Sequence, residues 1–217
     1  MKAAVLLLAG GAGKRFSSSN PKQFSFKKGR PLLDHVLEVF LKEERVKEIA
    51  VALPPDKVEK YRRAGSSRVR FVSGGKRRRD SVLNAAAGLS DCCDYVLIHD
   101  VSRPFLDPVM LKYFIDHLRG RPALIFGRPL SDTLKKVSGN RITGTVSRES
   151  LWLAETPQAF RRDVFERIVD FLARKKADFT DDSSIAEQLG VPVRILKTPG
   201  LNFKITYPED AALLRRL

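Results

Sequence analysis

Mostly apolar runs of four to seven residues recur along the chain, at 3–9, 49–53, 69–72, 95–98, 123–127 and 193–196. Such runs are typical of strands that are buried on both faces of a parallel sheet. The segments between them carry apolar residues at helical spacing, which predicts helices beginning near residues 31, 56, 80, 108, 164, 180 and 208. Strands and helices are therefore expected to alternate, as they do in α/β proteins.

The alternation stops over residues 128–157, which are rich in Arg, Thr, Ser and Gly. Two strand-like pieces at 132–135 and 142–146, with a turn at 138–140, predict an inserted β-hairpin arm. An isolated hairpin is marginal in water, so the arm needs a partner surface. We expect one domain over residues 1–217, α/β in class, with a Rossmann-like, mostly parallel sheet, helices on both faces and an inserted arm at about 128–157.

The first apolar run ends at a glycine cluster that is followed by cations: Gly10-Gly11-Ala12-Gly13-Lys14-Arg15, then Pro21-Lys22-Gln23. Glycines let backbone N–H groups approach a polyphosphate closely, so the segment predicts a phosphate-binding loop in which Arg15 and Lys22 supply charge. A Walker loop is excluded, because Arg15 stands where Ser or Thr is required. A dinucleotide fingerprint is disfavoured, because its third glycine falls on Phe16. The alternative is a glycine turn after an edge strand, with the cations on the surface.

A second glycine pair, Gly74-Gly75, precedes four cations at 76–79 and then Asp80-Ser81, a pair expected to cap a helix that runs to residue 88. The cations suggest contact with nucleic acid, but no aromatic residue is interleaved for base stacking, so a solvated surface is favoured.

Asp100 follows the run 95–98, at the carboxyl end of a predicted parallel strand, where α/β sheets bind ligands. It is the candidate ligand for Mg²⁺ or a ribose, since Mg²⁺ takes one or two carboxylates together with phosphate oxygens and waters. A turn aspartate is the alternative interpretation.

The charge and the cysteine content of the chain limit the ligands and the cellular location that can be expected. Forty Lys and Arg against 25 Asp and Glu give a formal charge of +15, which suits nucleotides, phosphorylated metabolites or nucleic acid, although a charged surface alone names no partner. Cys92 and Cys93 are adjacent and are the only cysteines, so we expect neither a disulfide framework nor a metal-binding cysteine motif, and we expect a cytoplasmic location. The first apolar run is too short for a membrane span, and no membrane partner is expected.

The segment 8–15 with Pro21-Lys22-Gln23 resembles the signature loop of nucleotidyltransferases that join a sugar or polyol phosphate to CTP. Its Pro-Lys-Gln ending is similar to that of the 2-C-methyl-D-erythritol 4-phosphate cytidylyltransferase family. Other motifs resemble the same family: the segments 74–82, 99–104, 132–135, 145–148, 156–160, 180–184, 202–206 and 208–210. The residues that depart from its usual pattern include Val101, Ser102, Ser147, Asp182, Ser183, Leu201, Phe203 and Ile205.

The resemblance implies that a phosphate oxygen of methylerythritol phosphate attacks the α-phosphorus of CTP and releases pyrophosphate, with Mg²⁺ bound beside CTP. This step belongs to isoprenoid precursor synthesis by the non-mevalonate pathway. Because the attacking phosphate is already ionised, the chemistry requires positioning and charge neutralisation rather than a covalent nucleophile.

The resemblance also assigns residues to roles. Those implied to bind the nucleotide are Ala9, Gly10, Gly11, Ala12, Gly13, Gly74, Gly75, Arg78, Ser81 and Asp100, of which Asp100 would also hold the metal. Those implied to bind the acceptor are Arg103, Thr133, Arg148, Thr180 and Lys204. The catalytic cations would be Arg15, Lys22, Arg148 and Lys204. For Arg103 the rival role is a structural ion pair with Asp100.

The arm is implied to reach a second subunit, giving a homodimer whose active sites are completed in trans by Arg148. Two alternatives stay open. A ribitol-5-phosphate cytidylyltransferase of the same build would use the same contacts to a polyol phosphate. A basic nucleic-acid-binding module, suggested by the charge of +15 and by Lys76 to Arg79, is the alternative of a different class. It does not explain the motifs between residues 8 and 210, so no nucleic acid partner is expected.

Overall fold

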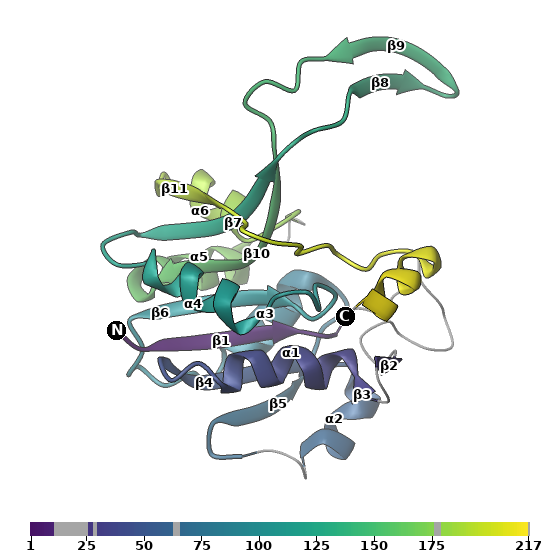
Figure 1. The fold of residues 1–217 in the computed structure, drawn as a ribbon. Coiled ribbons are helices and arrows are strands. Elements are labelled where there is room, and N and C mark those ends of the chain that lie inside the picture. Colours follow the sequence, from purple (N-terminus) through teal and green to yellow (C-terminus); the bar gives the residue numbers. More distant parts are fainter. Residues whose placement is uncertain (11–25, 28–29, 63–65, 176–178, 217) are drawn as a thin grey trace.

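The chain forms an α/β fold around one seven-stranded sheet (Figure 1). The structure, a computed structural model, describes residues 1–10, 26–27, 30–62, 66–175 and 179–216. The sheet has the order β11-β7-β10-β6-β1-β4-β5. Its strands are β1 (Ala3–Leu8), β4 (Val46–Leu53), β5 (Val69–Ser73), β6 (Tyr95–Asp100), β7 (Ala123–Pro129), β10 (Trp152–Arg161) and β11 (Val193–Lys197). The helices are α1 (Leu32–Leu41), α2 (Pro55–Arg62), α3 (Arg78–Ala86), α4 (Pro108–Asp116), α5 (Arg162–Arg174) and α6 (Ser183–Gln188).

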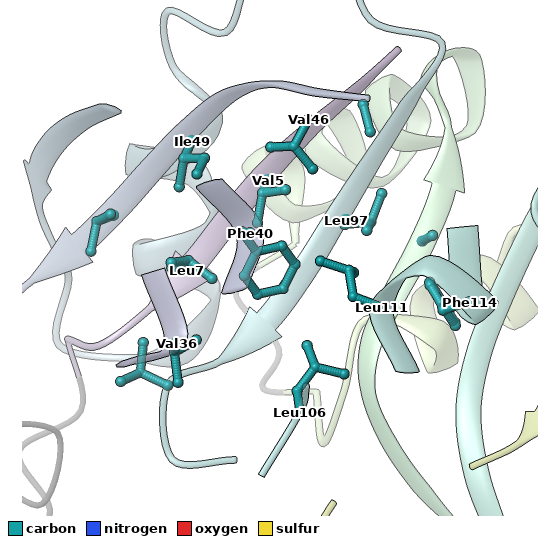
Figure 2. Packing of buried hydrophobic residues seen from close by; sticks show 14 of the residues in the cluster. Val5, Leu7, Val36, Phe40, Val46, Ile49, Leu97, Leu106, Leu111 and Phe114 are labelled. Carbon is teal, nitrogen blue, oxygen red and sulfur yellow. The ribbon is translucent and has the colours of Figure 1, made fainter. Parts of the chain in front are cut away.

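Successive residues of the central strands face opposite sides of the sheet, and each side is covered by helices. On one side, Val5 and Leu97 pack in the same buried cluster as Phe40 of α1 and Leu111 of α4 (Figure 2). On the other side, the intervening strand residues, such as Leu6, pack with side chains of α3, α5 and α6. The continuous apolar runs of the sequence thus reflect burial on both faces, and the predicted α/β class is confirmed.

The arm is present as a separate two-stranded sheet of β8 (Leu134–Ser138) and β9 (Arg141–Val146), which projects from the body of the protein (Figure 1). The turn between them includes Gly139, whose φ of +56° lies in the left-handed region that glycine adopts without strain. A small hairpin of β2 (Phe26–Lys27) and β3 (Arg30–Pro31) precedes α1.

The structure excludes one alternative interpretation and contains one strand that the sequence did not predict. β1 pairs with both β4 and β6, so the glycine segment does not follow an edge strand. The chain leaving the arm forms β10, a ten-residue strand that is antiparallel to both of its neighbours, β6 and β7. The sequence did not predict β10, because polar residues interrupt its apolar ones. The last element is a 3₁₀ helix, η2 (Pro208–Arg216).

The strand order reverses beside β1, and this position is where doubly wound sheets bind ligands. The chain runs from β1 to β4 and β5 on one side, then returns to β6 on the other side. Leu8 at the end of β1 is in register with Asp100 at the end of β6. No helix in the described ranges is long and apolar enough to cross a bilayer.

Candidate active site

A pocket of about 510 Å³ opens at the carboxyl end of β6. It is lined by five residues that the sequence marks for nucleotide, metal or acceptor binding, namely Arg78, Asp100, Arg103, Thr180 and Lys204. They come from five separate segments: the start of α3, the end of β6, the turn after it, the segment before α6 and the chain between β11 and η2. The fold therefore brings residues far apart in sequence to one place, at the position where the strand order reverses.

Asp100 is held between two cations. Its Oδ2 lies 2.5 Å from Lys204 Nζ, and its Oδ1 lies 3.4 Å from Arg78 Nη2. Burial alone would raise the pKa of Asp100, but the charges of Arg78 and Lys204 hold that pKa well below its usual range. The carboxylate is therefore ionised at neutral pH, as a ligand for a divalent cation must be. Asp100 is thus no isolated turn aspartate.

A chain of hydrogen bonds fixes the backbone of Asp100. The Asp100 N–H donates to Thr156 Oγ1 at 3.1 Å, and Thr156 Oγ1 lies 3.1 Å from His99 Nδ1. His99 Nε2 lies 3.2 Å from the Arg103 carbonyl, which can only accept, so Nε2 carries the proton and Nδ1 accepts from Thr156. Burial lowers the pKa of His99 to about 4, so the ring is neutral at pH 7. His99 is thus a structural support for Asp100.

Arg78 bridges two acidic residues. Besides Asp100, it contacts Asp182, whose Oδ2 lies 2.6 Å from Arg78 Nη1. Burial opposes the charge on Arg78, but the charges of Asp182 and Asp100 raise its pKa, so it remains a cation. The prediction that residues 76–79 form a solvated surface is thus wrong in part. Arg78 is half-buried, and Arg79 donates to the carbonyls of Leu172 and Lys175.

Arg103 is tied to the backbone. Its Nη1 donates to the Asn202 carbonyl at 2.8 Å and its Nη2 to the Ala154 carbonyl at 3.2 Å. It forms an ion pair with Glu155, with Nη1 3.9 Å from Oε1, and not with Asp100, the partner named in its rival role. Arg103 still lines the pocket, while it joins β10 to the segment that carries Lys204.

The glycine segments meet at the ends of β1 and β5. A Cβ on Gly74 would lie 3.0 Å from the Gly10 Cα, so a side chain there would fit only if the two turns moved slightly apart. A Cβ on Gly75 would lie 2.1 Å from the Asp80 Cβ. Ser81 Oγ accepts from the Gly75 N–H at 3.1 Å and lies 3.3 Å from the Arg77 carbonyl. These residues therefore build a tight junction beside the pocket.

The expected helix cap at Asp80-Ser81 is corrected in detail. α3 begins at Arg78, so both residues lie inside its first turn. Asp80 Oδ2 accepts from the Arg77 N–H at 3.2 Å, which satisfies a backbone donor from within the helix rather than from its cap position.

Thr133 directly precedes β8 and Arg148 follows β9 by two residues, so both lie at the base of the arm. Both are exposed and lie outside the residues that line this pocket. Arg148 Nη1 donates to the Ser131 carbonyl. Ala9 and Gly10 lie at the end of β1, whereas the other predicted loop residues, Gly11, Ala12, Gly13, Arg15 and Lys22, lie outside the described residues.

Sequence reasoning gave no role to several buried polar residues that build the site. Gln158 Oε1 accepts from the backbone N–H groups of Asp182 and Ser183, at 3.1 and 2.9 Å. Glu155 Oε2 accepts from Thr198 Oγ1 at 2.8 Å and from Asn202 Nδ2 at 3.1 Å. The signal that could have found them was a group of polar residues, 155–158, at the start of a segment that returns to the core.

The donor set around Asp100 fits a magnesium nucleotide better than a protein-only metal cage. Asp100 presents an ionised carboxylate to a pocket that Asp181 and Glu187 also line, and Mg²⁺ commonly takes one or two carboxylates with its other ligands from phosphate and water. No cluster of three or more His, Cys, Asp or Glu side chains suited to a metal occurs among the described residues.

Comparison with known proteins gives a match over almost the whole chain. The family model described as "IspD: 2-C-methyl-D-erythritol 4-phosphate cytidylyltransferase" matches residues 3–216. A protein of that name from Geobacter metallireducens is 39% identical, with 98% of this chain and 96% of that protein covered. One from Geotalea uraniireducens is 37% identical, with 98% and 95% covered.

Some relatives are longer. The chain covers 55% of a protein from Desulfotalea psychrophila named "Bifunctional enzyme IspD/IspF", at 34% identity over 97% of this chain. Among solved structures, the 2-C-methyl-D-erythritol 4-phosphate cytidylyltransferase from Thermus thermophilus has a TM-score of 0.80 at 28% identity, covering 100% of this chain and 98% of that one. The corresponding Francisella tularensis protein has a TM-score of 0.84 at 25% identity, with 98% of each chain covered.

Proposed function

The chain belongs to the 2-C-methyl-D-erythritol 4-phosphate cytidylyltransferase family, and we propose that it transfers the cytidylyl group of CTP to 2-C-methyl-D-erythritol 4-phosphate with release of pyrophosphate. The product is 4-diphosphocytidyl-2-C-methyl-D-erythritol, an intermediate of isoprenoid precursor synthesis by the non-mevalonate pathway. The observation that carries the proposal at the level of the site is the convergence of Arg78, Asp100 and Lys204 in one pocket at the carboxyl end of β6.

In this proposal the protein acts by positioning and by neutralising charge. Arg78 and the Gly10 and Gly74 turns would contact the nucleotide, and Lys204 and Thr180 would contact the acceptor. Lys204 would orient the acceptor phosphate for in-line attack on the α-phosphorus, and Arg15 and Lys22 would stabilise the charge of the α-phosphate and leaving pyrophosphate. Asp100 would hold Mg²⁺ together with CTP oxygens. When bound, the ion supplies positive charge to the triphosphate.

Lys204 and Asp100 also restrain each other. Because Lys204 Nζ lies 2.5 Å from Asp100 Oδ2, the ammonium occupies a position that a divalent cation on that oxygen would take. The two proposed roles are compatible if Lys204, whose side chain is 40% exposed, turns from Asp100 towards the acceptor phosphate. The metal ion would then replace the Lys204 ammonium beside Asp100, and the negative charge of the carboxylate would stay balanced by a cation.

The proposal includes a homodimer in which Thr133 and Arg148 of the partner subunit complete the acceptor site. It is supported by the projecting arm and by large apolar side chains that are exposed on it and at its base, Val137, Ile142, Leu151, Trp152 and Leu153. Light scattering should give about twice the chain mass of 24.4 kDa. An active monomer would contradict the arm's role.

The acceptor is tested by incubating the protein with CTP, Mg²⁺ and a panel of polyol phosphates and measuring pyrophosphate release. We expect release with 2-C-methyl-D-erythritol 4-phosphate. Preference for ribitol 5-phosphate would support the alternative of the same build, and nucleic acid binding without pyrophosphate release would support the other class. A cytoplasmic location is proposed as well, supported by the free thiols of Cys92 and Cys93.

A further inference from the structure

Asp182 is a buried carboxylate beside the pocket, with only 1% of its surface exposed. It directly precedes α6, the helix whose first residues line the pocket wall. Its Oδ2 lies 2.6 Å from Arg78 Nη1, while Arg78 Nη2 lies 3.4 Å from Asp100 Oδ1. One guanidinium therefore contacts two carboxylates from distant parts of the chain, and it lies closer to Asp182.

The Asp182 side chain does not cap α6, although its position before the helix favours that role. Other groups satisfy the free N–H groups at this helix start. Gln158 Oε1 accepts from the N–H groups of Asp182 and Ser183, and Asp181 Oδ1 accepts from that of Ser184 at 3.1 Å. The Asp182 carboxylate is thus directed at Arg78 instead of at its own helix.

A buried carboxylate is costly unless it is paired, and Asp182 is paired with a cation that also reaches the site. Burial raises the pKa of Asp182, and the charge of Arg78 opposes that rise. An arginine beside a single carboxylate tends to bind both oxygens through two parallel N–H groups. Because Asp182 takes Nη1, only Nη2 is left near Asp100, at the longer distance. Asp182 therefore limits how closely Arg78 can pair with Asp100.

We propose that Asp182 is a positioning residue: it holds the Arg78 guanidinium away from Asp100, so that Arg78 faces the nucleotide and Asp100 keeps an oxygen for the metal ion bound with CTP. This inference rests on the proposed function, because it concerns how the same pocket binds CTP. Removing the Asp182 charge lets Arg78 close onto Asp100. Both groups are then withdrawn from the nucleotide.

The test is Asp182→Asn, with CTP binding measured by isothermal titration calorimetry in the presence of Mg²⁺. A hydrogen bond or ion pair to a charged group is worth about 1.5–3 kcal/mol, so the dissociation constant of CTP should rise by about 10- to 100-fold. The KM for CTP should rise in parallel, whereas the KM for the acceptor should change by less than about threefold. Asp182→Glu, which keeps the charge, should retain most of the CTP affinity.

Two comparisons separate positioning from general damage. In an Arg78→Ala background, Asp182→Asn should weaken CTP binding by less than about twofold, because the residue through which it acts is gone. Glu187→Gln removes another carboxylate from the same pocket wall and helix, and it should have a much smaller effect than Asp182→Asn.

Unchanged CTP affinity in folded Asp182→Asn, or an undiminished effect of that change in the Arg78→Ala background, would overturn the inference. If Asp182→Asn does not fold, a loss of CTP affinity in folded Asp182→Glu as large as that caused by Arg78→Ala counts against it equally. Failure of the proposed function gives a different result: the unsubstituted protein itself would neither bind CTP nor release pyrophosphate from it.

Discussion

Replacing His99 should change how the stability of the protein depends on pH. The imidazole is completely buried, stacks at a tilt against Phe40 with ring centroids 5.3 Å apart, and has a pKa of about 4 against the usual 6.5. Below pH 6.5 the unfolded chain binds a proton at this residue that the folded chain does not bind. Lowering the pH therefore favours unfolding, and the loss grows until the pH reaches about 4.

The magnitude follows from the two pKa values. Between pH 7 and pH 5 the native protein should lose about 2 kcal/mol of unfolding free energy through His99 alone, and about 3 kcal/mol by pH 4. His99→Gln retains a side-chain N–H donor, now from an amide, but cannot titrate, so this part of the pH dependence should vanish. The variant should be less stable at pH 7, because it loses packing against Phe40, and the gap to the native protein should narrow as the pH falls.

Urea unfolding at pH 7, 6 and 5 measures the effect, and the other titrating groups cancel in the difference between the two proteins. Phe40→Leu is the matched control, because it removes packing at the same place but leaves His99 able to titrate. Its curve of unfolding free energy against pH should run parallel to that of the native protein. A parallel curve for His99→Gln would refute the argument, since it would mean that the buried imidazole titrates as freely as in the unfolded chain.

Two further changes test the supports of the site. Glu155→Gln should lower the unfolding free energy by about 2–4 kcal/mol, because Glu155 is 2% exposed and its charge compensates those of Arg103 and the partly exposed Arg128. The control in urea unfolding is Glu149→Gln, which changes an exposed carboxylate. Equal stability of the two variants would contradict the argument. Gly75→Ala should cost about 1–3 kcal/mol, because its Cβ would lie 2.1 Å from that of Asp80. Gly144→Ala, with open space around it, should be nearly neutral, and a neutral Gly75→Ala would show that α3 shifts freely.

The central sheet was predictable because its strands are buried on both faces. A strand in that environment is mostly apolar, so β1 and the first four residues of β6 are visible as continuous runs. The same argument correctly placed Asp100 at the carboxyl end of β6, because a carboxylate that follows such an apolar run must lie where the strand ends. The arm was predictable for the opposite reason, since β8 and β9 are exposed and lack an apolar run.

β10 was not predictable in this way, because its buried polar residues find partners that are remote in sequence. Gln158 binds the backbone at 182 and 183, and Glu155 binds Thr198 and Asn202. Read locally, these residues resemble a loop, since a buried polar group is stable only with a partner that the local sequence does not reveal. The role of Arg103 was uncertain for the same reason: its acceptors are carbonyls of residues 154 and 202.

These remote contacts explain why the pocket can be built from chain segments outside the strands and helices. Lys204 and Thr180 lie outside the strands and helices, but both segments are anchored on β10, through Asn202 to Glu155 and through Asp182 to Gln158. β10 in turn is hydrogen-bonded along β6, the strand that ends in Asp100. The segments of Lys204 and Thr180, the proposed acceptor residues, are therefore held by a strand that pairs with β6, the strand of the proposed metal ligand Asp100. A displacement of β10 would therefore move the Lys204 and Thr180 segments together, which makes this antiparallel strand the element that holds both segments in the pocket.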